Sequence, residues 1–246
     1  ILQFLRFIIL AKERVSKILI QIPHPLEDLV TANLELNGIE INPKTIKAKY
    51  ITSLMMLPKI LNINLSNIPK PFKVNYFKSI EKQIEKISEI KHLKIGIAWS
   101  GNPDHVNDYN RSCPLIELSS IIELDYQFFT LQKDINQVDL KYLKSHKNVH
   151  ILNRYIKTFS NTAHILSKLD LVITVDTSIA HLSGCMNKTT ILILPYRCDW
   201  RWEHHDKYMW YDNMKIVKQD KPNNWAFICS EIYKIIEDLR LNHIQI

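Results

Sequence analysis

Glycine is scarce in this chain, which has only four glycines among its 246 residues. Neither the GxGxxG fingerprint of dinucleotide-binding enzymes nor the GxxxxGK loop of P-loop NTPases occurs in the sequence. Both classes of nucleotide-binding protein are therefore disfavoured.

Long apolar runs are also missing, because the most hydrophobic stretches near the start are interrupted by Lys and Arg well short of the roughly 18 residues that span a bilayer. A membrane span is therefore not expected. The first residues lack both a Met and the order of a signal peptide, so we interpret the chain as a fragment of a longer protein.

The four cysteines are widely spaced and form no CxxC pair, which argues against both a zinc site and a disulfide framework. No metal or other cofactor is predicted. Free cysteines fit a reducing compartment, so a cytoplasmic location is expected.

Positive charge is in excess, with a formal net charge of +7 and a pI near 9.1. Such a charge is compatible with nucleic acid, a phosphate-rich substrate or an anionic membrane surface. The lysines are spread over many segments and no ribonucleoprotein motif accompanies them, so no nucleic-acid partner is predicted. A peripheral membrane contact stays open.

From Leu93 onward, short β-branched runs alternate with amphipathic segments, a pattern typical of a parallel sheet with crossover helices. The predicted strands are 93–98, 127–131, 148–152, 171–175 and 189–194. The predicted helices are 115–124, 137–144, 162–169, 179–186 and 225–239.

The first part of the chain predicts a second α/β unit, with a helix-like start, a strand at 17–22 and a helix at 26–36 ended by Asn37-Gly38. A proline-rich stretch at 68–71 and a charged amphipathic segment follow. We therefore expect a partial N-terminal unit at 1–78, a linker helix at 79–92 and a C-terminal domain at 93–246.

Ligands of open α/β sheets bind beyond the carboxyl ends of the strands, so the junctions there are the candidate sites. After strand 171–175, Asp176, Thr177 and Ser178 open a helix whose free N–H groups and dipole favour a diphosphate. The alternative is that Asp176 only caps this helix. His181 is expected near Asp176 or a phosphate, although a lone helical histidine is more often simply packed.

Other junctions offer weaker signals. Trp99 to Pro103 contains Ser100 and Gly101, where a ligand can approach the backbone, although an ordinary turn is the simpler interpretation. Arg111 and Lys133 could neutralise phosphates, but most exposed cations are only solvated. In the segment 199–202, Trp200 and Trp202 flank Arg201 and could stack on a base, whereas Trp210 and Trp225 are predicted to be core residues.

Together these segments resemble the heptosyltransferase family, glycosyltransferase family 9, and the related transferase domains that follow tetratricopeptide repeats in bacterial proteins. The resemblance runs in order from Ile95 to Trp202. It rests on IGIAWSGNP at 95–103, Asn107-Asp108 with Arg111-Ser112, LQK at 131–133, DLVITVDTS at 170–178 with AHL at 180–182, and DWRW at 199–202.

This resemblance implies an α/β fold of the GT-B type, with two Rossmann-like units of which the N-terminal one is truncated. It also implies a set of residues that bind a nucleotide-sugar donor. They are Ser100, Gly101, Arg111, Gln132, Lys133, Asp176, Thr177, Ser178, His181 and Trp200. The family's general base is an aspartate of a Gly-Asp pair expected just before Ile1, so no catalytic residue is assigned within the chain.

The implied activity is metal-independent transfer of a sugar from a nucleoside-diphosphate donor to a hydroxyl of a glycan, a lipid-linked molecule or a protein. Because fold does not fix chemistry, a nucleotide-sugar epimerase or hydrolase stays possible. A catalytically incomplete domain that only binds the nucleotide sugar is the other alternative.

Overall fold

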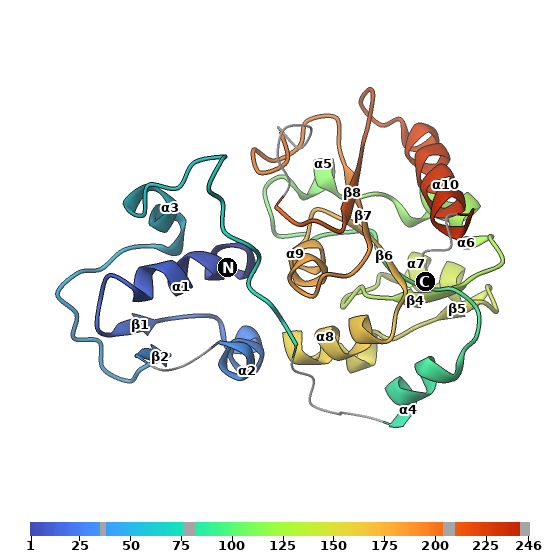
Figure 1. Ribbon diagram of the computed structural model, residues 1–246. Coiled ribbons are helices and arrows are strands. Elements are labelled where there is room, and N and C mark those ends of the chain that lie inside the picture. Colours follow the sequence, from blue (N-terminus) through green and yellow to red (C-terminus); the bar gives the residue numbers. More distant parts are fainter. Residues whose placement is uncertain (35–37, 76–81, 204–209, 242–246) are drawn as a thin grey trace.

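The computed structural model describes residues 1–34, 38–75, 82–203 and 210–241. Its larger part is built on a six-stranded, wholly parallel sheet of order β5-β4-β3-β6-β7-β8 (Figure 1). The strands are β3 (Lys94–Ala98), β4 (Gln127–Thr130), β5 (Val149–His150), β6 (Leu171–Val175), β7 (Thr190–Leu194) and β8 (Met214–Lys218).

Helices cover both faces of this sheet, as the alternation of buried side chains requires. Ile95, Ile97 and Ile173 pack into one apolar cluster, whereas their neighbours Ala98 and Val172 pack into the other. The helices of this part are α5 (Asp108–Arg111), η4 (Leu115–Leu118), α6 (Ser119–Ile122), α7 (Gln137–Lys144), η5 (Asn153–Tyr155), α8 (Phe159–Ser167), α9 (Ser178–Cys185) and α10 (Trp225–Leu241).

A smaller N-terminal unit contains a two-stranded parallel sheet, in which Ile18 pairs with Ile39. Its elements are η1 (Leu2–Phe4), α1 (Leu5–Lys12), β1 (Ile18–Ile20), α2 (His24–Asn33), β2 (Ile39–Ile41), η2 (Leu54–Met56) and α3 (Leu57–Ile60). A short α4 (Lys82–Glu85) and η3 (Lys86–Glu89) precede the large sheet. Among the described residues, no helix meets the length and hydropathy needed to cross a membrane.

The two sheets share a continuous apolar cluster, because η1 packs on α9 and α2 packs on α8. Arg6 lies at this junction with only 2% of its surface exposed. Its guanidinium donates to the carbonyls of Gln3 (2.9 Å), Pro69 (3.1 Å) and Trp210 (3.2 Å). A buried guanidinium must have its N–H groups satisfied, and of these three bonds the one to Trp210 ties α1 to the C-terminal part.

The predicted α/β architecture is confirmed, and each strand predicted after Leu93 is present in the parallel sheet. Two strands were missed: β2, which has only three residues, and the edge strand β8, which has two lysines among its five residues. The burial of Trp210 and Trp225 is also confirmed.

The helix predicted at 26–36 is wrong in its bounds. It spans His24–Asn33, because Leu34 is already extended (φ −90°, ψ 127°). Gly38 does adopt a left-handed conformation (φ 77°), but as the residue before β2. The predicted boundary at 78/79 lies outside the described residues, so the division into domains stays a prediction.

Gly184 on α9 offers a test of this packing, because a Cβ there would overlap the ring of the buried Tyr211. We expect Gly184→Ala to lower the free energy of unfolding by about 1–3 kcal/mol despite the better helix propensity of alanine. Urea unfolding would measure the change, with the exposed helical substitution Ser230→Ala as the control. An unchanged stability would contradict the close packing of α9 against Tyr211.

Candidate functional site

The carboxyl ends of β3, β4 and β6 bring together most of the predicted site residues. Gln132 follows β4, and its Oε1 accepts a hydrogen bond from the N–H of Ser100 after β3 (3.2 Å). The N–H of Gly101 donates to Oγ of Ser112 (2.9 Å). The loop after β3 is thus held by side chains from two neighbouring segments, which fixes the path of Ser100 and Gly101.

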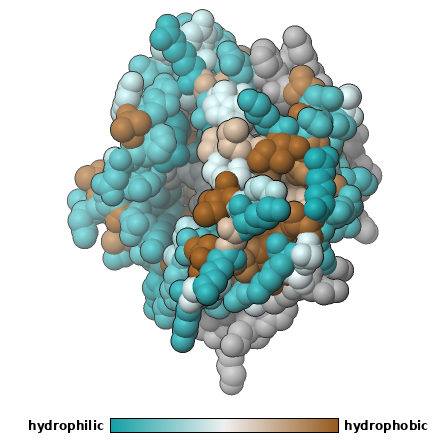
Figure 2. Space-filling view, turned by 90° about the vertical axis from the view of Figure 1, so that its left-hand side faces the viewer, coloured by the Kyte–Doolittle hydropathy of each residue, from teal (hydrophilic) through white to brown (hydrophobic). Residues whose placement is uncertain are grey.

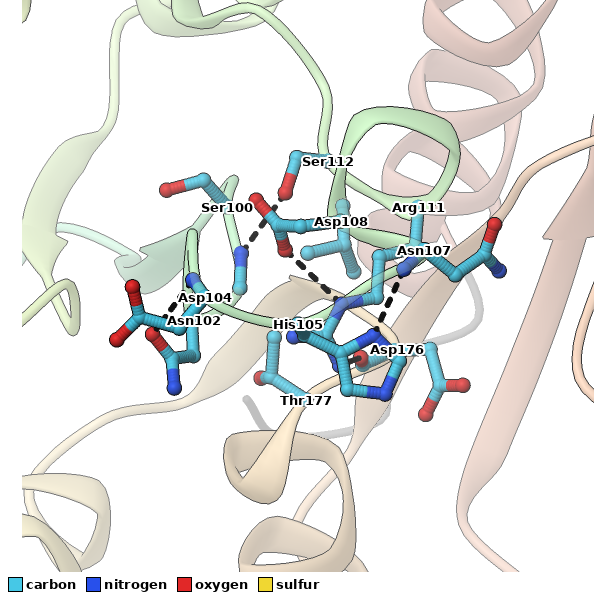
Figure 3. Close-up of polar contacts among 12 residues, drawn as sticks. Ser100, Asn102, Asp104, His105, Asn107, Asp108, Arg111, Ser112, Asp176 and Thr177 are labelled. Atoms are coloured by element: carbon cyan, nitrogen blue, oxygen red, sulfur yellow. Dashed lines mark hydrogen bonds and ion pairs between the residues drawn. The ribbon is translucent and has the colours of Figure 1, made fainter.

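Arg111 joins this loop to the end of β6 (Figure 3). Its Nε donates to Asp108 (3.0 Å), and one terminal nitrogen donates to the carbonyl of Asp176 (3.2 Å). A Cβ at position 101 would overlap this guanidinium, so only glycine lets Arg111 lie across the loop. The guanidinium is half-buried and oriented by both bonds, as expected of an anion-binding arginine.

The N-terminus of α9 follows β6 directly. Thr177 is the capping residue, because its Oγ1 accepts a hydrogen bond from the N–H of Ile179 (3.2 Å). The alternative in which Asp176 caps the helix is therefore wrong: the chain is still leaving the strand at Asp176. The unpaired N–H groups of the first turn and the helix dipole still favour an anion at this end.

Two adjoining cavities occupy this edge of the sheet. The larger has a volume of about 750 Å³ and is lined by Ser100, Gly101, Arg111, Gln132, Lys133, Thr177 and Ser178, among others. The smaller, of about 250 Å³, is lined by Asp176 and His181 and again by Arg111, Thr177 and Ser178. Nine of the ten residues predicted to bind the donor therefore line these two cavities. The cavities meet at Arg111, Thr177 and Ser178, which line both.

Trp200 is the predicted residue that the structure sets apart. It lines neither cavity, its side chain is 50% exposed, and the Arg201 guanidinium lies over its ring at 4.7 Å. Trp202 is buried and stacks on His181 with ring centroids 5.6 Å apart. The pair of tryptophans therefore does not form a stacking face for a base.

His181 does not have the role expected of it. Its Nδ1 is 3.0 Å from the hydroxyl of Tyr211, not bonded to Asp176. Burial lowers the pKa of His181 to about 3, and the positive charges of Arg201 and Arg6 act in the same direction. The imidazole is therefore neutral near pH 7 and lends no positive charge to a phosphate.

Asp176 is also desolvated, but desolvation changes the pKa of an acid in the opposite direction to that of a histidine. Burial raises the pKa of its carboxyl, while a hydrogen bond from Trp202 and the charge of Arg111 counteract this effect. A partly desolvated carboxylate beside an arginine can accept hydrogen bonds from ligand hydroxyls. Asp176 therefore suits a sugar better than a phosphate.

Several residues of the site were not predicted from the sequence. Asp108 and Ser112 orient Arg111 and Gly101, and Asp139 accepts the indole N–H of Trp99 (2.8 Å). Thr158 lines the larger cavity and caps α8 through a capping box with Asn161. Asp108 and Ser112 belong to a segment on which the resemblance rests, and Thr158 has a capping signal, a polar partner three residues later.

Arg201 and Asp199 close the smaller cavity. Arg201 pairs with Asp199 (2.7 Å) and donates to Oε1 of the buried Gln3 (3.0 Å), so this cavity borders the N-terminal unit. Within the described parts of the chain, no group of three or more His, Cys, Asp or Glu side chains could hold a metal ion.

No family model and no curated protein matches this sequence, but solved structures match its fold. The iron-containing dodecameric glycosyltransferase TibC of enterotoxigenic E. coli aligns with 98% of this chain and 74% of its own, with a TM-score of 0.57 and 10% identity. The heptosyltransferase TibC in complex with ADP-D-beta-D-heptose aligns with a TM-score of 0.51 and 11% identity, over 93% of this chain and 60% of its own. The chain has the fold of these glycosyltransferases.

The fold predicted from the resemblance, an α/β structure of the heptosyltransferase-like GT-B type, is therefore confirmed. E. coli ADP-heptose lps heptosyltransferase II also matches, over 97% of this chain and 81% of its own, with 8% identity and a TM-score of 0.49. The roles of individual residues stay predictions, because identities this low relate folds and not sites.

The low pKa of His181 predicts how stability depends on pH. Below its ordinary pKa of 6.5 the unfolded chain takes up a proton that the folded chain refuses, so this site costs stability as the pH falls toward about 3. We expect the unfolding free energy of the wild type to fall more steeply than that of His181→Gln, by up to about 1.4 kcal/mol per pH unit.

Urea midpoints between pH about 4.5 and about 7.5 would measure the two slopes. The exposed His92→Gln serves as the matched control. Equal slopes for the wild type and His181→Gln would show that the imidazole is not held neutral.

Proposed function

We propose that this chain binds a nucleoside-diphosphate sugar in the two adjoining cavities and transfers the sugar to an acceptor hydroxyl. The observation that carries the proposal is the meeting of both cavities at Arg111, Thr177 and Ser178, beyond the strand ends of a glycosyltransferase-like fold. One of the matching TibC structures is a complex with ADP-D-beta-D-heptose, which is a donor of this class.

The diphosphate belongs at the junction of the cavities. Arg111 supplies a fixed positive charge there, and the first turn of α9 supplies N–H groups and the positive end of its dipole. Departure of the diphosphate concentrates negative charge on its oxygens. Donors already oriented toward that position stabilise the leaving group without reorganising during the reaction.

The larger cavity suits the nucleoside, because its volume of about 750 Å³ lies within the usual range of ligand pockets. Gln132 and Lys133 offer polar groups to a ribose or base there. The smaller cavity then receives the sugar beside Asp176, whose carboxylate can accept hydrogen bonds from sugar hydroxyls.

Transfer passes through an oxocarbenium-like state, in which the bond from the anomeric carbon to the diphosphate breaks as the acceptor oxygen approaches. The acceptor hydroxyl loses its proton to a general base, which the family resemblance expects just before Ile1. The residues of this chain supply the other requirement, a site that accepts the charge of the leaving diphosphate.

Two substitutions separate the diphosphate from the sugar. Arg111→Ala removes the cation shared by both cavities, so we expect about tenfold to hundredfold weaker binding of both a nucleotide sugar and its nucleoside diphosphate. Asp176→Asn should weaken only the nucleotide sugar, because its side chain is assigned to the sugar hydroxyls. Titration calorimetry with a panel of nucleotide sugars would measure both affinities.

Arg240→Ala is the matched control, since Arg240 lies on α10 in an exposed pair with Glu237. Unchanged affinities in both site variants would rule out the assignment. Mass spectrometry of products with candidate acceptors would separate transfer from epimerisation, and binding without any product would favour the donor-binding alternative.

Metal independence is part of the proposal, although both matching TibC structures are of an iron-containing enzyme. We expect donor affinity to be the same before and after treatment with EDTA, because Arg111 and α9 neutralise the diphosphate. Calorimetry of the two samples would test this, with added Mg²⁺ or Fe²⁺ as the comparison. A loss of affinity restored by either ion would show that a metal takes part.

A further inference from the structure

The excess of positive charge has a single source in the sequence. Residues 41–80 contain seven of the 32 basic residues and none of the 25 acidic residues. The rest of the chain is therefore balanced, with 25 residues of each sign. The six lysines of this segment that the structure describes are all exposed, and none is ion-paired with a described carboxylate: Lys44, Lys47, Lys49, Lys59, Lys70 and Lys73.

The same segment exposes an unusual number of large apolar side chains. Ile51 is 84% exposed and Tyr50 is 77% exposed, and five others are also on the surface: Ile46, Met55, Met56, Ile60 and Leu65. We call these seven side chains, together with Lys44, Lys47, Lys49 and Lys59, the basic-apolar surface. It lies on the side formed by the N-terminal unit, where Figure 2 shows apolar patches among hydrophilic ones.

The part of the segment that the structure describes, residues 41–75, is folded, because other apolar side chains within it are buried. Leu57, Leu61, Phe72 and Val74 all belong to the main apolar cluster. Arg14 of the N-terminal unit also donates to the carbonyls of Ile60 (3.1 Å) and Leu61 (3.5 Å) at the end of α3. The exposed side chains therefore stand on a supported backbone. In Figure 1 the part of this backbone from β2 to α3 lies at the outer edge of the N-terminal unit, away from the six-stranded sheet. The last residues of the segment return to the C-terminal part, where the N–H of Val74 donates to the carbonyl of Cys185 (3.2 Å).

We infer that the basic-apolar surface docks this protein on an anionic lipid bilayer. Lysines next to a membrane are attracted by its negative surface potential, and exposed apolar side chains enter the boundary between headgroups and acyl chains. The combination of both kinds of side chain, in a segment whose sequence has no acidic residue, matches that surface. Nucleic acid would account for the lysines but not for exposed Ile51, Met55 and Leu65.

Vesicle sedimentation of the whole chain tests the inference. We expect binding to vesicles of phosphatidylcholine with roughly a third phosphatidylglycerol, weak binding to phosphatidylcholine alone, and weaker binding at about 1 M than at about 0.1 M salt. Changing Lys44, Lys47 and Lys49 together to Glu should reduce binding to the anionic vesicles at least about tenfold. Tyr50→Ser with Ile51→Ser should reduce it severalfold, because the apolar contribution is lost.

The matched control changes Lys141, Lys144 and Lys147 to Glu, which alters the charge equally at three exposed positions of the C-terminal part. Circular dichroism melts establish that each variant is folded. The inference is overturned if the wild type does not bind anionic vesicles. It is also overturned if the control loses as much binding as the variant changed at Lys44, Lys47 and Lys49, or if Tyr50→Ser with Ile51→Ser has no effect. Binding of single-stranded RNA in place of vesicles would also overturn it.

The inference does not rest on the proposed function. None of the substituted residues lines either cavity, so nucleotide-sugar affinity should be unchanged in all three variants. Failure of vesicle binding with intact donor binding would reject the docking surface alone. Failure of donor binding with intact vesicle binding would reject the transferase assignment alone.

Discussion

The parallel pairing of β3 with β6 is the constraint on which the candidate site depends. In this register Ala98 lies opposite Thr174, so both strands end at the same edge and their loops begin side by side. Ser100 and Asp176 are 76 positions apart in sequence. They lie in the same small region because the parallel hydrogen bonding of β3 and β6 places the residues that follow both strands at one edge of the sheet. Arg111 can bridge these loops only after the strands have brought them together.

Electrostatics at this edge is asymmetric. Arg111 is oriented by Asp108 and by a carbonyl, and it remains beside the N-terminus of α9, so the junction of the two cavities favours an anion. His181 could have added positive charge, but it is kept neutral by burial against Trp202 and Tyr211. The positive charges of Arg201 and Arg6 also disfavour its protonation. The positive charge at the junction of the two cavities therefore comes from Arg111 and not from His181.

Charge is also divided at the scale of the whole chain. The excess lies in residues 41–80 of the N-terminal side, and the rest of the chain, which bears the cavities, is balanced in its acidic and basic residues. This balance allows the local field at Arg111 to be set by nearby groups. The proposed membrane-facing surface and the proposed donor site are therefore separate in both position and chemistry.

The sequence by itself indicated the α/β class and five of the six strands after Leu93, and nine of the ten residues that it predicted for the site line the two cavities. These features are local, because a buried strand appears in the sequence as a run of β-branched residues. The residues that follow each run lie at the edge of a parallel sheet where ligands bind. The strand β2 was missed because it has only three residues, and the edge strand β8 because its two lysines interrupt the apolar pattern.

Only the tertiary structure decided which side chains act on which. Thr177 and not Asp176 caps α9, since capping depends on where the backbone leaves the strand. Trp202 is buried and Trp200 exposed, although they are two positions apart in the same loop. His181 is neutral because Tyr211, Trp202 and Arg201 lie beside it. These residues are 20 or more positions away in sequence, so no local spacing predicts that they contact His181. Hydrogen bonds and desolvation depend on three-dimensional neighbours, and those exist only once the chain has folded.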